Sequence, residues 1–182
     1  MKFKGEIIGQ AIILRTCLLS DCNETYVKWL NDPLVNMYLE TRFSEQTLHS
    51  ISEFVDSNLK SESSYLYAII TNDSEKKHIG NIKLGPIHPH YAYADISYFI
   101  GDIDYWGKGI AAEAIKLVVD FAFTQLKLRR LQAGAFEDNI GSIKALEKAG
   151  FELEGRFREK LYTQGKWQDH LYYGLLNENE ER

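Results

Sequence analysis

The spacing of apolar residues along this chain predicts short strands interleaved with amphipathic helices. Leu48, Ile51, Val55 and Leu59 recur every three or four residues, which places them on one face of a helix. Runs rich in tyrosine, isoleucine and valine that are bounded by turn residues indicate strands instead. The predicted strands cover residues 11–16, 65–71, 78–84, 91–100, 130–136, 151–158 and 169–176.

Polar residues and glycines mark where the helices should begin and end. We expect Ser20 or Asp21 to cap the first helix, with Glu24 as the capping-box partner of Asp21. Ser44 is the expected cap of the second helix, and Gly150 closes the last one in a left-handed conformation. The four predicted helices run from about 21 to 31, from 44 past 59, from about 110 to 126, and from 141 to 149.

The order of these elements predicts an α+β, or mixed α/β, fold in which one sheet carries most of the chain. No repeat, low-complexity segment or linker rich in proline and glycine interrupts the sequence. We therefore expect residues 1–182 to form a single domain, with the acidic end, residues 177–182, frayed.

Composition and charge narrow the classes of function. Hydrophobic residues make up 45% of the chain and charged residues 26%, which is typical of a folded globular protein and not of a disordered one. A formal net charge of −5 argues against a broad nucleic-acid-binding surface. Gln10 interrupts the apolar stretch from Ile7 to Leu14, and Arg15 follows it at once. We interpret this stretch as strand rather than as a targeting or membrane segment.

The two cysteines, Cys17 and Cys22, are too few for a disulfide scaffold and do not match a zinc-binding spacing. We expect two free thiols in a reducing cytoplasm, and no bound metal. Neither cysteine lies in a nucleophile motif, so any group transfer should be direct rather than through a covalent enzyme intermediate.

The loop Trp106-Gly107-Lys108-Gly109 lies between a predicted strand and the long helix, and it is the segment that suggests chemistry. Glycines let successive backbone N–H groups converge and let a ligand approach closely. The N-terminus of the following helix adds unsatisfied N–H donors and partial positive charge. These features favour an anion such as a pyrophosphate, although two glycines before a helix also occur in ordinary tight turns.

Three phosphate-binding interpretations compete for this loop. Gly107, Gly109 and Ala112 formally satisfy a dinucleotide fingerprint, but the motif lies past mid-chain and the next strand, residues 130–136, carries no acidic residue for a ribose. A P-loop requires Ser or Thr after Gly-Lys, whereas here Ile110 follows Gly109. Coenzyme A, whose pyrophosphate needs only a backbone cradle, remains.

At this loop the sequence resembles the GNAT acetyltransferase superfamily, and within it the branch that contains the ribosomal-protein N-terminal acetyltransferases. The acetyl-CoA motif of the family is Gln/Arg-x-x-Gly-x-Gly/Ala. Gly109 and Ala111 match it, while Trp106 replaces its first residue, as is common in this branch. The similarity covers nearly the whole chain, because further family positions match Asn139, Ser142, Gly150, Phe151, Glu154-Gly155-Arg156, Arg158-Glu159, Gly165 and Asp169.

The resemblance implies a central, mostly antiparallel mixed sheet in which two strands splay apart and coenzyme A wedges into the gap. The strand that ends near Ile100 would pair its exposed backbone with the pantetheine arm, and Asn139 would contact that arm from the facing side. The amides of the loop would hold the pyrophosphate. The implied acetyl-CoA-binding residues are Tyr98, Phe99, Ile100, Gly101, Trp106, Gly107, Lys108, Gly109, Ile110, Ala111, Asn139 and Ser142.

Acetyl transfer to an amine needs a proton acceptor, an oxyanion site and a proton donor. An alkylammonium has a pKa of about 10, and only the neutral amine attacks a thioester. Backbone N–H groups at the splayed strand can stabilise the oxyanion, and the leaving thiolate benefits from a proton. Many GNAT members place a tyrosine donor where this chain has Leu146. In the branch resembled here Ser142 is the usual substitute, although a serine at this position can also merely start the helix.

Two carboxylates are candidates for the base. Asp95 alternates with Ile96 in the strand before the loop, so its side chain points to one defined face. Glu159 is the second candidate, by resemblance to an acid in the last hairpin, although a single carboxylate of this kind is more often solvated than catalytic. His88 and His90 are expected near the substrate mouth, as a pair that is more often incidental than a base or metal site.

We therefore expect an acetyl-CoA-dependent N-acetyltransferase whose acceptor is a primary amine. Protein N-terminal amines, amino sugars and other small amines all stay open, because residues 29–33 and 38–40 resemble relatives of more than one kind. We expect neither nucleic acid nor membrane as a partner. The alternative is a non-catalytic acyl-CoA-binding module on the same scaffold, and the oligomeric state, a homodimer included, is not determined by the sequence.

Overall fold

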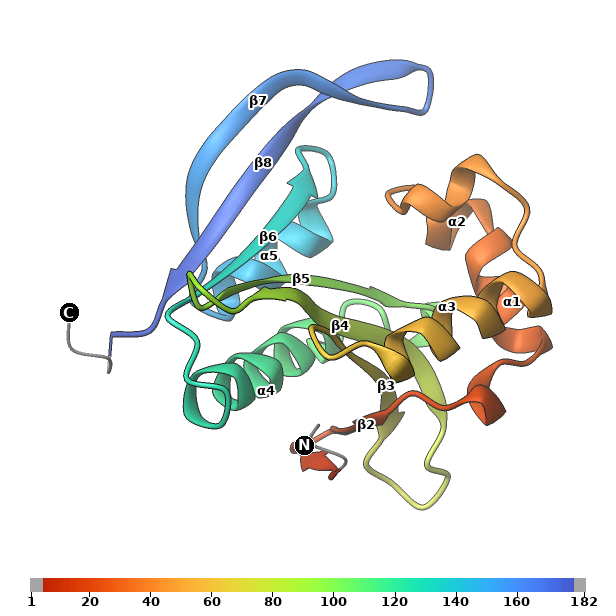
Figure 1. Ribbon diagram of the computed structural model, residues 1–182. Coiled ribbons are helices and arrows are strands. Elements are labelled where there is room, and N and C mark those ends of the chain that lie inside the picture. The colour runs from red at the N-terminus through yellow and green to blue at the C-terminus, as the bar shows by residue number, and fades with distance from the viewer. Residues whose placement is uncertain (1–4, 179–182) are drawn as a thin grey trace.

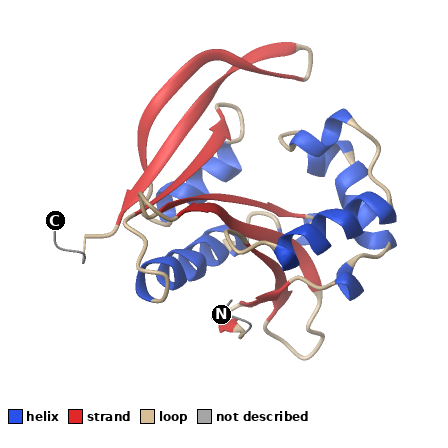
Figure 2. Ribbon diagram, viewed as in Figure 1, coloured by secondary structure: helices blue, strands red, loops and turns tan. Residues whose placement is uncertain are grey.

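Apolar residues continue through the middle strands with little alternation because helices cover both faces of the sheet. In the computed structural model, which describes residues 5–178, all seven residues of β3 (Tyr65–Thr71) are buried. The sheet has eight strands in the order β1-β2-β3-β4-β5-β6-β8-β7 (Figures 1 and 2). This architecture confirms the predicted mixed α/β fold.

The observed elements agree with most of the predicted ranges, and β3 and β6 agree at both ends. The strands are β1 (Ile7–Ile8), β2 (Ile12–Thr16), β3 (Tyr65–Thr71), β4 (His78–His88), β5 (Tyr93–Ile100), β6 (Arg130–Phe136), β7 (Glu152–Thr163) and β8 (Lys166–Leu176). The α-helices are α1 (Glu24–Asn31), α2 (Pro33–Asn36), α3 (Leu48–Lys60), α4 (Ile110–Thr124) and α5 (Ile140–Lys148). Three short 3-10 turns are η1 (Leu19–Asp21), η2 (Glu40–Phe43) and η3 (Ile103–Tyr105).

The sheet is antiparallel except between β5 and β6, which are parallel and joined by the crossover helix α4. These two strands pair at only three positions: Tyr93 with Arg130, Ala94 with Leu131, and Asp95 with Gln132. Beyond Asp95 the strands diverge, whereas β6 pairs with β8 along its whole length. The predicted splay is therefore confirmed, and it leaves the β6 side of residues 96–100 without a strand partner.

Two apolar clusters, one on each face of the sheet, hold this frame rigid. Ile115 of α4, Leu131 of β6 and Leu146 of α5 are completely buried in the first cluster. Ile51 and Val55 of α3 lie in the second, against the alternate side chains of β3. Phe99 of β5 also packs against the second cluster, whereas Leu131, Ala133 and Ala135 of β6 belong to the first.

Two of the predicted helix caps are wrong. Asn23, rather than Ser20 or Asp21, caps α1 by accepting hydrogen bonds from the N–H groups of Thr25 and Tyr26. The carboxylate of Asp21 instead receives two hydrogen bonds from Arg15, at 2.6 and 2.7 Å. Thr47, rather than Ser44, caps α3. In each case several capping residue types are adjacent in the sequence, and tertiary contacts select one of them.

The C-terminal hairpin of β7 and β8 is longer than predicted and turns at Gln164 and Gly165. Figure 1 shows it extending away from the rest of the sheet. Asn177 is not frayed, since it is buried and its side chain donates to the carbonyl of Leu128 at 3.1 Å. Residues 179–182 of the predicted tail lie outside the described residues. Across residues 5–178, every helix falls short of the length and apolar character that a bilayer crossing requires.

Candidate active site

A cavity of about 1190 Å³ occupies the place where β5 and β6 diverge. Its walls come from β5, β6, the loop before α4 with the first turn of that helix, α5, the segment around α2, and the hairpin of β7 and β8. The cavity brings together most of the residues that the sequence predicts for the site: Asp95, Tyr98, Phe99, Ile100, Trp106, Gly107, Lys108, Gly109, Ile110, Ala111, Asn139 and Ser142.

At one end of the cavity, the loop before α4 forms a cradle of backbone amides, residues 106–111. Gly107 and Gly109 have φ angles of 72° and 80°, which are left-handed values that favour glycine. Gly109 is the N-cap residue of α4, and no side chain caps this helix. The N–H groups of the first helical turn are therefore free to bind an anion, as the sequence predicts.

Three lysines line the cavity that contains this cradle, and sequence reasoning identified only one of them. Lys108 belongs to the predicted loop, whereas Lys144 and Lys148 lie on α5 and also line the cavity. The Nζ atom of Lys148 lies 3.8 Å from the position that a Cβ on Gly109 would occupy. The spacing of four residues between Lys144 and Lys148, which puts them on one helix face, was the available signal. These charges make the cradle suitable for a polyphosphate.

The strand edge beside the cradle is partly used by the protein itself. The indole Nε1 of Trp106 donates to the carbonyl of Ile100 at 2.8 Å, which fixes the loop against the end of β5. Gly101 lies outside the cavity, and its N–H donates to the carbonyl of Ile79 at 2.9 Å. The ring of Trp29 fills the space that a side chain at Gly101 would need. The free edge therefore ends at Ile100, one residue earlier than predicted.

Midway along the cavity, Ser142 of α5 and Tyr98 of β5 face each other across the splay. Their hydroxyl oxygens share a hydrogen bond of 2.8 Å. Asn139 caps α5 by accepting a hydrogen bond from the Ser142 N–H at 3.1 Å, so the Ser142 hydroxyl is not needed to start the helix. Burial raises the pKa of the Tyr98 phenol to about 12, against an opposing effect of the Ser142 hydrogen bond. The phenol therefore stays protonated at neutral pH.

The two predicted carboxylate bases occupy different environments. Asp95 lines the cavity at the last position where β5 pairs with β6, and Gln132 of β6 donates to its Oδ1 at 2.8 Å. Glu159 does not line the cavity, since it lies on an exposed, left-handed bulge of β7. His88 and His90 are wrongly placed by the sequence argument. His88 stacks on Tyr93 at the start of β5, away from the cradle at the other end of that strand.

The far wall of the cavity combines residues 38–40, which the family resemblance singles out, with residues that sequence reasoning missed. Tyr38, Glu40, Phe136, His170 and Tyr172 all line it. They come from the segment after α2, from β6 and from β8, and the rings of Tyr38 and Phe136 lie 5.2 Å apart. No local pattern marks Phe136, His170 and Tyr172, because their common position arises only when the hairpin folds back towards the N-terminal helices.

Hydrogen bonds hold this far wall together, and one of them runs from the Gln164 side-chain amide to the sulfur of Met37. The Arg42 guanidinium donates to the carbonyl of Tyr162 at 3.2 Å, and the Thr163 hydroxyl donates to the carbonyl of Met37 at 3.0 Å. Both bonds join the tip of the β7–β8 hairpin to the segment after α2. The wall therefore has a defined shape, although it is assembled from segments more than 100 residues apart.

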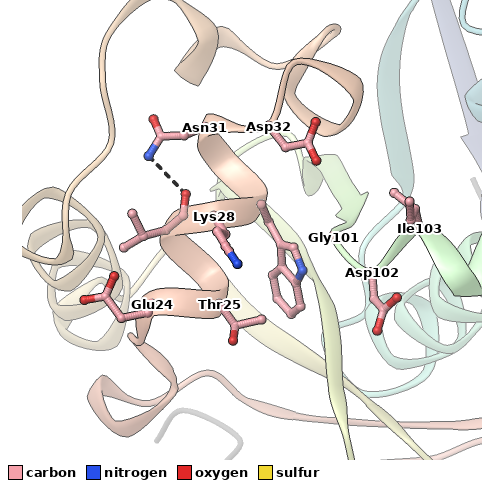
Figure 3. Close-up of a pocket in the computed structure, with 10 residues that line it drawn as sticks. Glu24, Thr25, Lys28, Asn31, Asp32, Gly101, Asp102 and Ile103 are labelled. Atoms are coloured by element: carbon pink, nitrogen blue, oxygen red, sulfur yellow. Dashed lines mark hydrogen bonds between the residues drawn. The ribbon is translucent and has the colours of Figure 1, made fainter.

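A second hollow, of about 640 Å³, lies beside α1 and shares no lining residue with the first (Figure 3). Glu24, Asp32 and Asp102 contribute carboxylates to it, and Gly101 lies at its edge. Asp102 pairs with Lys77 at 2.6 Å, and Asp32 caps α2 by accepting the N–H of Leu34. Two of these three acids thus have structural partners. We assign the chemistry to the larger cavity.

Comparisons with known proteins agree with this geometry. Residues 11–152 match the family model described as an acetyltransferase (GNAT) domain. YjcK of Bacillus subtilis, named as a probable N-acetyltransferase, is 40% identical over 133 residues, which is 72% of each chain.

Two solved structures share the fold. The ribosomal-protein acetyltransferase RimL in complex with coenzyme A superposes with a TM-score of 0.83 at 18% identity, covering 97% of this chain and 100% of the other. A spermidine N-acetyltransferase of Vibrio cholerae in complex with coenzyme A and spermine has a TM-score of 0.79 at 22% identity, covering 91% and 95%.

Proposed function

This chain belongs to the GNAT family of acetyltransferases, and from that premise we propose that it transfers the acetyl group of acetyl-CoA directly to a primary amine. One observation carries the proposal. A single cavity connects an anion cradle, an unpaired strand edge, a pair of hydrogen-bonded hydroxyls and a separate aromatic wall. A thioester carrier and an acceptor can therefore enter from different sides and meet where the sheet is open.

The donor half of the cavity fits acetyl-CoA. The amides of residues 106–111, with Lys108, Lys144 and Lys148 around them, would hold the pyrophosphate. The unpaired edge of residues 96–100 offers main-chain groups to the amides of pantetheine, in the way that a strand pairs with an extended peptide. The side chain of Asn139 lies on the facing wall.

The hydroxyl pair suits the departure of the thiolate. When the amine attacks the thioester carbon, the C–S bond breaks and sulfur leaves with a pKa of about 8.5 in water. The Ser142 O–H can donate a proton to it, and the Tyr98 phenol can donate to Ser142 in turn. N–H groups of the unpaired β5 edge would stabilise the oxyanion before the bond breaks.

Asp95 is the carboxylate of the proposed site. Its carboxylate would form an ion pair with a cationic acceptor, and the hydrogen bond from Gln132 fixes the position of that carboxylate. Its role as the base stays a prediction from the sequence, as does that of Glu159, which lies away from the cavity. The negative charge of Asp95 would attract the positive charge of a cationic acceptor.

The acceptor is proposed only as a primary amine. RimL is named for a ribosomal-protein substrate, and a second structural neighbour is a spermidine acetyltransferase. The far wall of this chain combines aromatic rings with the carboxylates of Glu40 and Asp138, which suits a cationic acceptor of either kind. Protein N-termini, amino sugars and polyamines therefore form the first panel to test.

Thiol release tests the proposed function. Purified protein, acetyl-CoA and each amine of the panel are combined, free coenzyme A is measured with a thiol reagent, and the acetylated product is identified by mass spectrometry. We expect turnover with at least one amine. Calorimetry that detects acetyl-CoA binding, together with no thiol release for any amine, would instead favour a non-catalytic acyl-CoA-binding module.

A further inference from the structure

His170 of β8 is a half-buried imidazole in the acceptor wall that the sequence argument left without a role. It is paired with Phe136 of β6 on one side and with Phe157 of β7 on the other. Its ring centroid lies 4.4 Å from that of Tyr172, the next residue on the same face of β8. Both side chains line the cavity, whereas Leu171 between them points into the core.

Gly134 makes room for this imidazole. Gly134 lies on β6, lines the same cavity, and is paired with Tyr172. A Cβ built on Gly134 would collide with Nε2 of His170, so any larger residue there would displace the ring. The missing side chain lets the imidazole lie against the β6 backbone, on the strand that borders the splay.

The environment of the His170 ring determines which of its two nitrogens can contact a ligand. Nδ1 is buried and has no hydrogen-bond partner among the described residues. Nε2 is therefore the nitrogen that remains for a ligand in the cavity. To accept a proton at Nε2, the neutral ring must carry its hydrogen on Nδ1, and the protonated ring carries a hydrogen on each nitrogen. The ring can then take a proton from a bound group at Nε2 and pass it to solvent.

The charged groups that face His170 have opposing effects on its pKa. Burial lowers the pKa of His170 below its usual value, Lys160 of β7 lowers it further, and Glu40 of η2 raises it. Tyr172 of the same strand lies beside the ring, and its hydroxyl accepts a hydrogen bond from Lys160 at 3.0 Å. Gly134 and Phe136 of β6 carry no charge. The imidazole is consequently neutral at pH 7 and able to accept a proton.

We propose that Nε2 of His170 is the proton acceptor for the attacking amine, a role that rests on the proposed acetyl transfer. The acceptor ammonium gives one proton to Nε2 of His170, which releases it to solvent, and the neutral nitrogen then forms a bond to the thioester carbon. As the C–S bond breaks, the thiolate takes a proton from Ser142, and the second proton lost by nitrogen restores the Ser142 hydroxyl. Asp95 lies at the closed end of the splay and keeps the acceptor charge in place.

The test compares wild-type enzyme with His170→Asn, His170→Ala and Asp95→Asn, using an amine that the wild type acetylates. We expect both His170 variants to lose roughly 100- to 10,000-fold in kcat, the usual range for a lost general base. Their affinity for acetyl-CoA should be unchanged within about twofold, because the cradle lies in the other half of the cavity. His49→Asn, an exposed histidine on α3, is the matched control.

Two measurements distinguish the loss of a proton acceptor from structural damage caused by the substitution. The wild-type kcat should fall as the pH is lowered, with an apparent pKa below 6.5, the usual histidine value. This acid limb of the pH–rate profile should disappear in His170→Asn. Added imidazole should restore part of the activity of His170→Ala, because that variant leaves a ring-sized space. Gly134→Ala, which keeps the imidazole but displaces it, should lower kcat without weakening acetyl-CoA binding.

Three results would overturn the role of His170. The first is wild-type kcat and pH dependence in His170→Asn. The second is a loss of kcat that neither imidazole nor the pH profile connects to a titrating ring. The third is disappearance of the acid limb in Asp95→Asn alone, which would assign the base to the carboxylate. If the wild-type protein binds acetyl-CoA but acetylates no amine, that result overturns the proposed acetyl transfer itself, before the role of His170 is tested.

Discussion

The two halves of the cavity are built in opposite ways. The donor half, residues 95–112 and 139–148, comes from two continuous segments, and much of its chemistry is carried by the backbone. The acceptor half comes from the segment around α2, from β6 and from the β7–β8 hairpin, and its chemistry is carried by side chains. An acetyl donor that is common to a whole family can be bound by main-chain groups. The choice of the acceptor molecule requires side chains that vary between members.

The largest expected effect comes from a charge placed in the donor cradle. Gly109→Glu should weaken acetyl-CoA binding roughly 100-fold or more, because two like charges about 4 Å apart repel by about 4 kcal/mol near a protein surface. Isothermal titration calorimetry measures the loss. Gly165→Glu is the matched control, since Gly165 also has a left-handed φ, of 77°, but lies in the β7–β8 turn and does not line the cavity.

Unchanged affinity in Gly109→Glu, with the fold intact by circular dichroism, would remove the cradle from the proposal. Equal losses in both variants would mean that the substitution acts through backbone strain. Either outcome would break the assignment of the donor half to the residues around Gly109.

The hydroxyl pair between the halves should give an intermediate effect. Ser142→Ala is expected to lower kcat roughly 10- to 100-fold, the lower part of the range for acid–base groups. Tyr98→Phe removes only the second hydroxyl and keeps the ring, so its loss should be smaller, about threefold to tenfold. Steady-state kinetics at saturating acetyl-CoA measures both. A larger loss in Tyr98→Phe than in Ser142→Ala would identify the phenol as the direct donor.

The smallest effect is expected at Glu40 in the acceptor half. Glu40→Gln should raise KM for a cationic amine about two- to fivefold, in line with the modest energies of exposed ion pairs. Because the Glu40 charge raises the pKa of His170, its removal should lower that pKa and move the acid limb of kcat to lower pH. Acetyl-CoA affinity should stay the same. A shift of the limb to higher pH would contradict the placement of Glu40 beside the imidazole.

Sequence reasoning located the parts of the cavity that depend on neighbours in the chain. The loop of residues 106–111 precedes α4, as its glycines indicate, and Ser142 contacts Tyr98 across the splay, while the ligand-binding roles of these residues stay predictions. It failed by one residue at Gly101, because the indole of Trp29, more than 70 positions earlier, occupies that place. It also misplaced His88 and His90, because their distance from the cradle depends on the length of β5.

The sequence alone determined the alternation of strands and helices, the crossover that places a glycine loop at a helix N-terminus, and the family to which these motifs point. Those properties follow from residues a few positions apart, whose geometry the backbone dictates. The tertiary structure alone decided that Tyr38, Phe136, His170 and Tyr172 form one wall and that Glu159 lies away from it. Side chains more than 100 residues apart meet only after the hairpin and the N-terminal helices have packed around a common sheet.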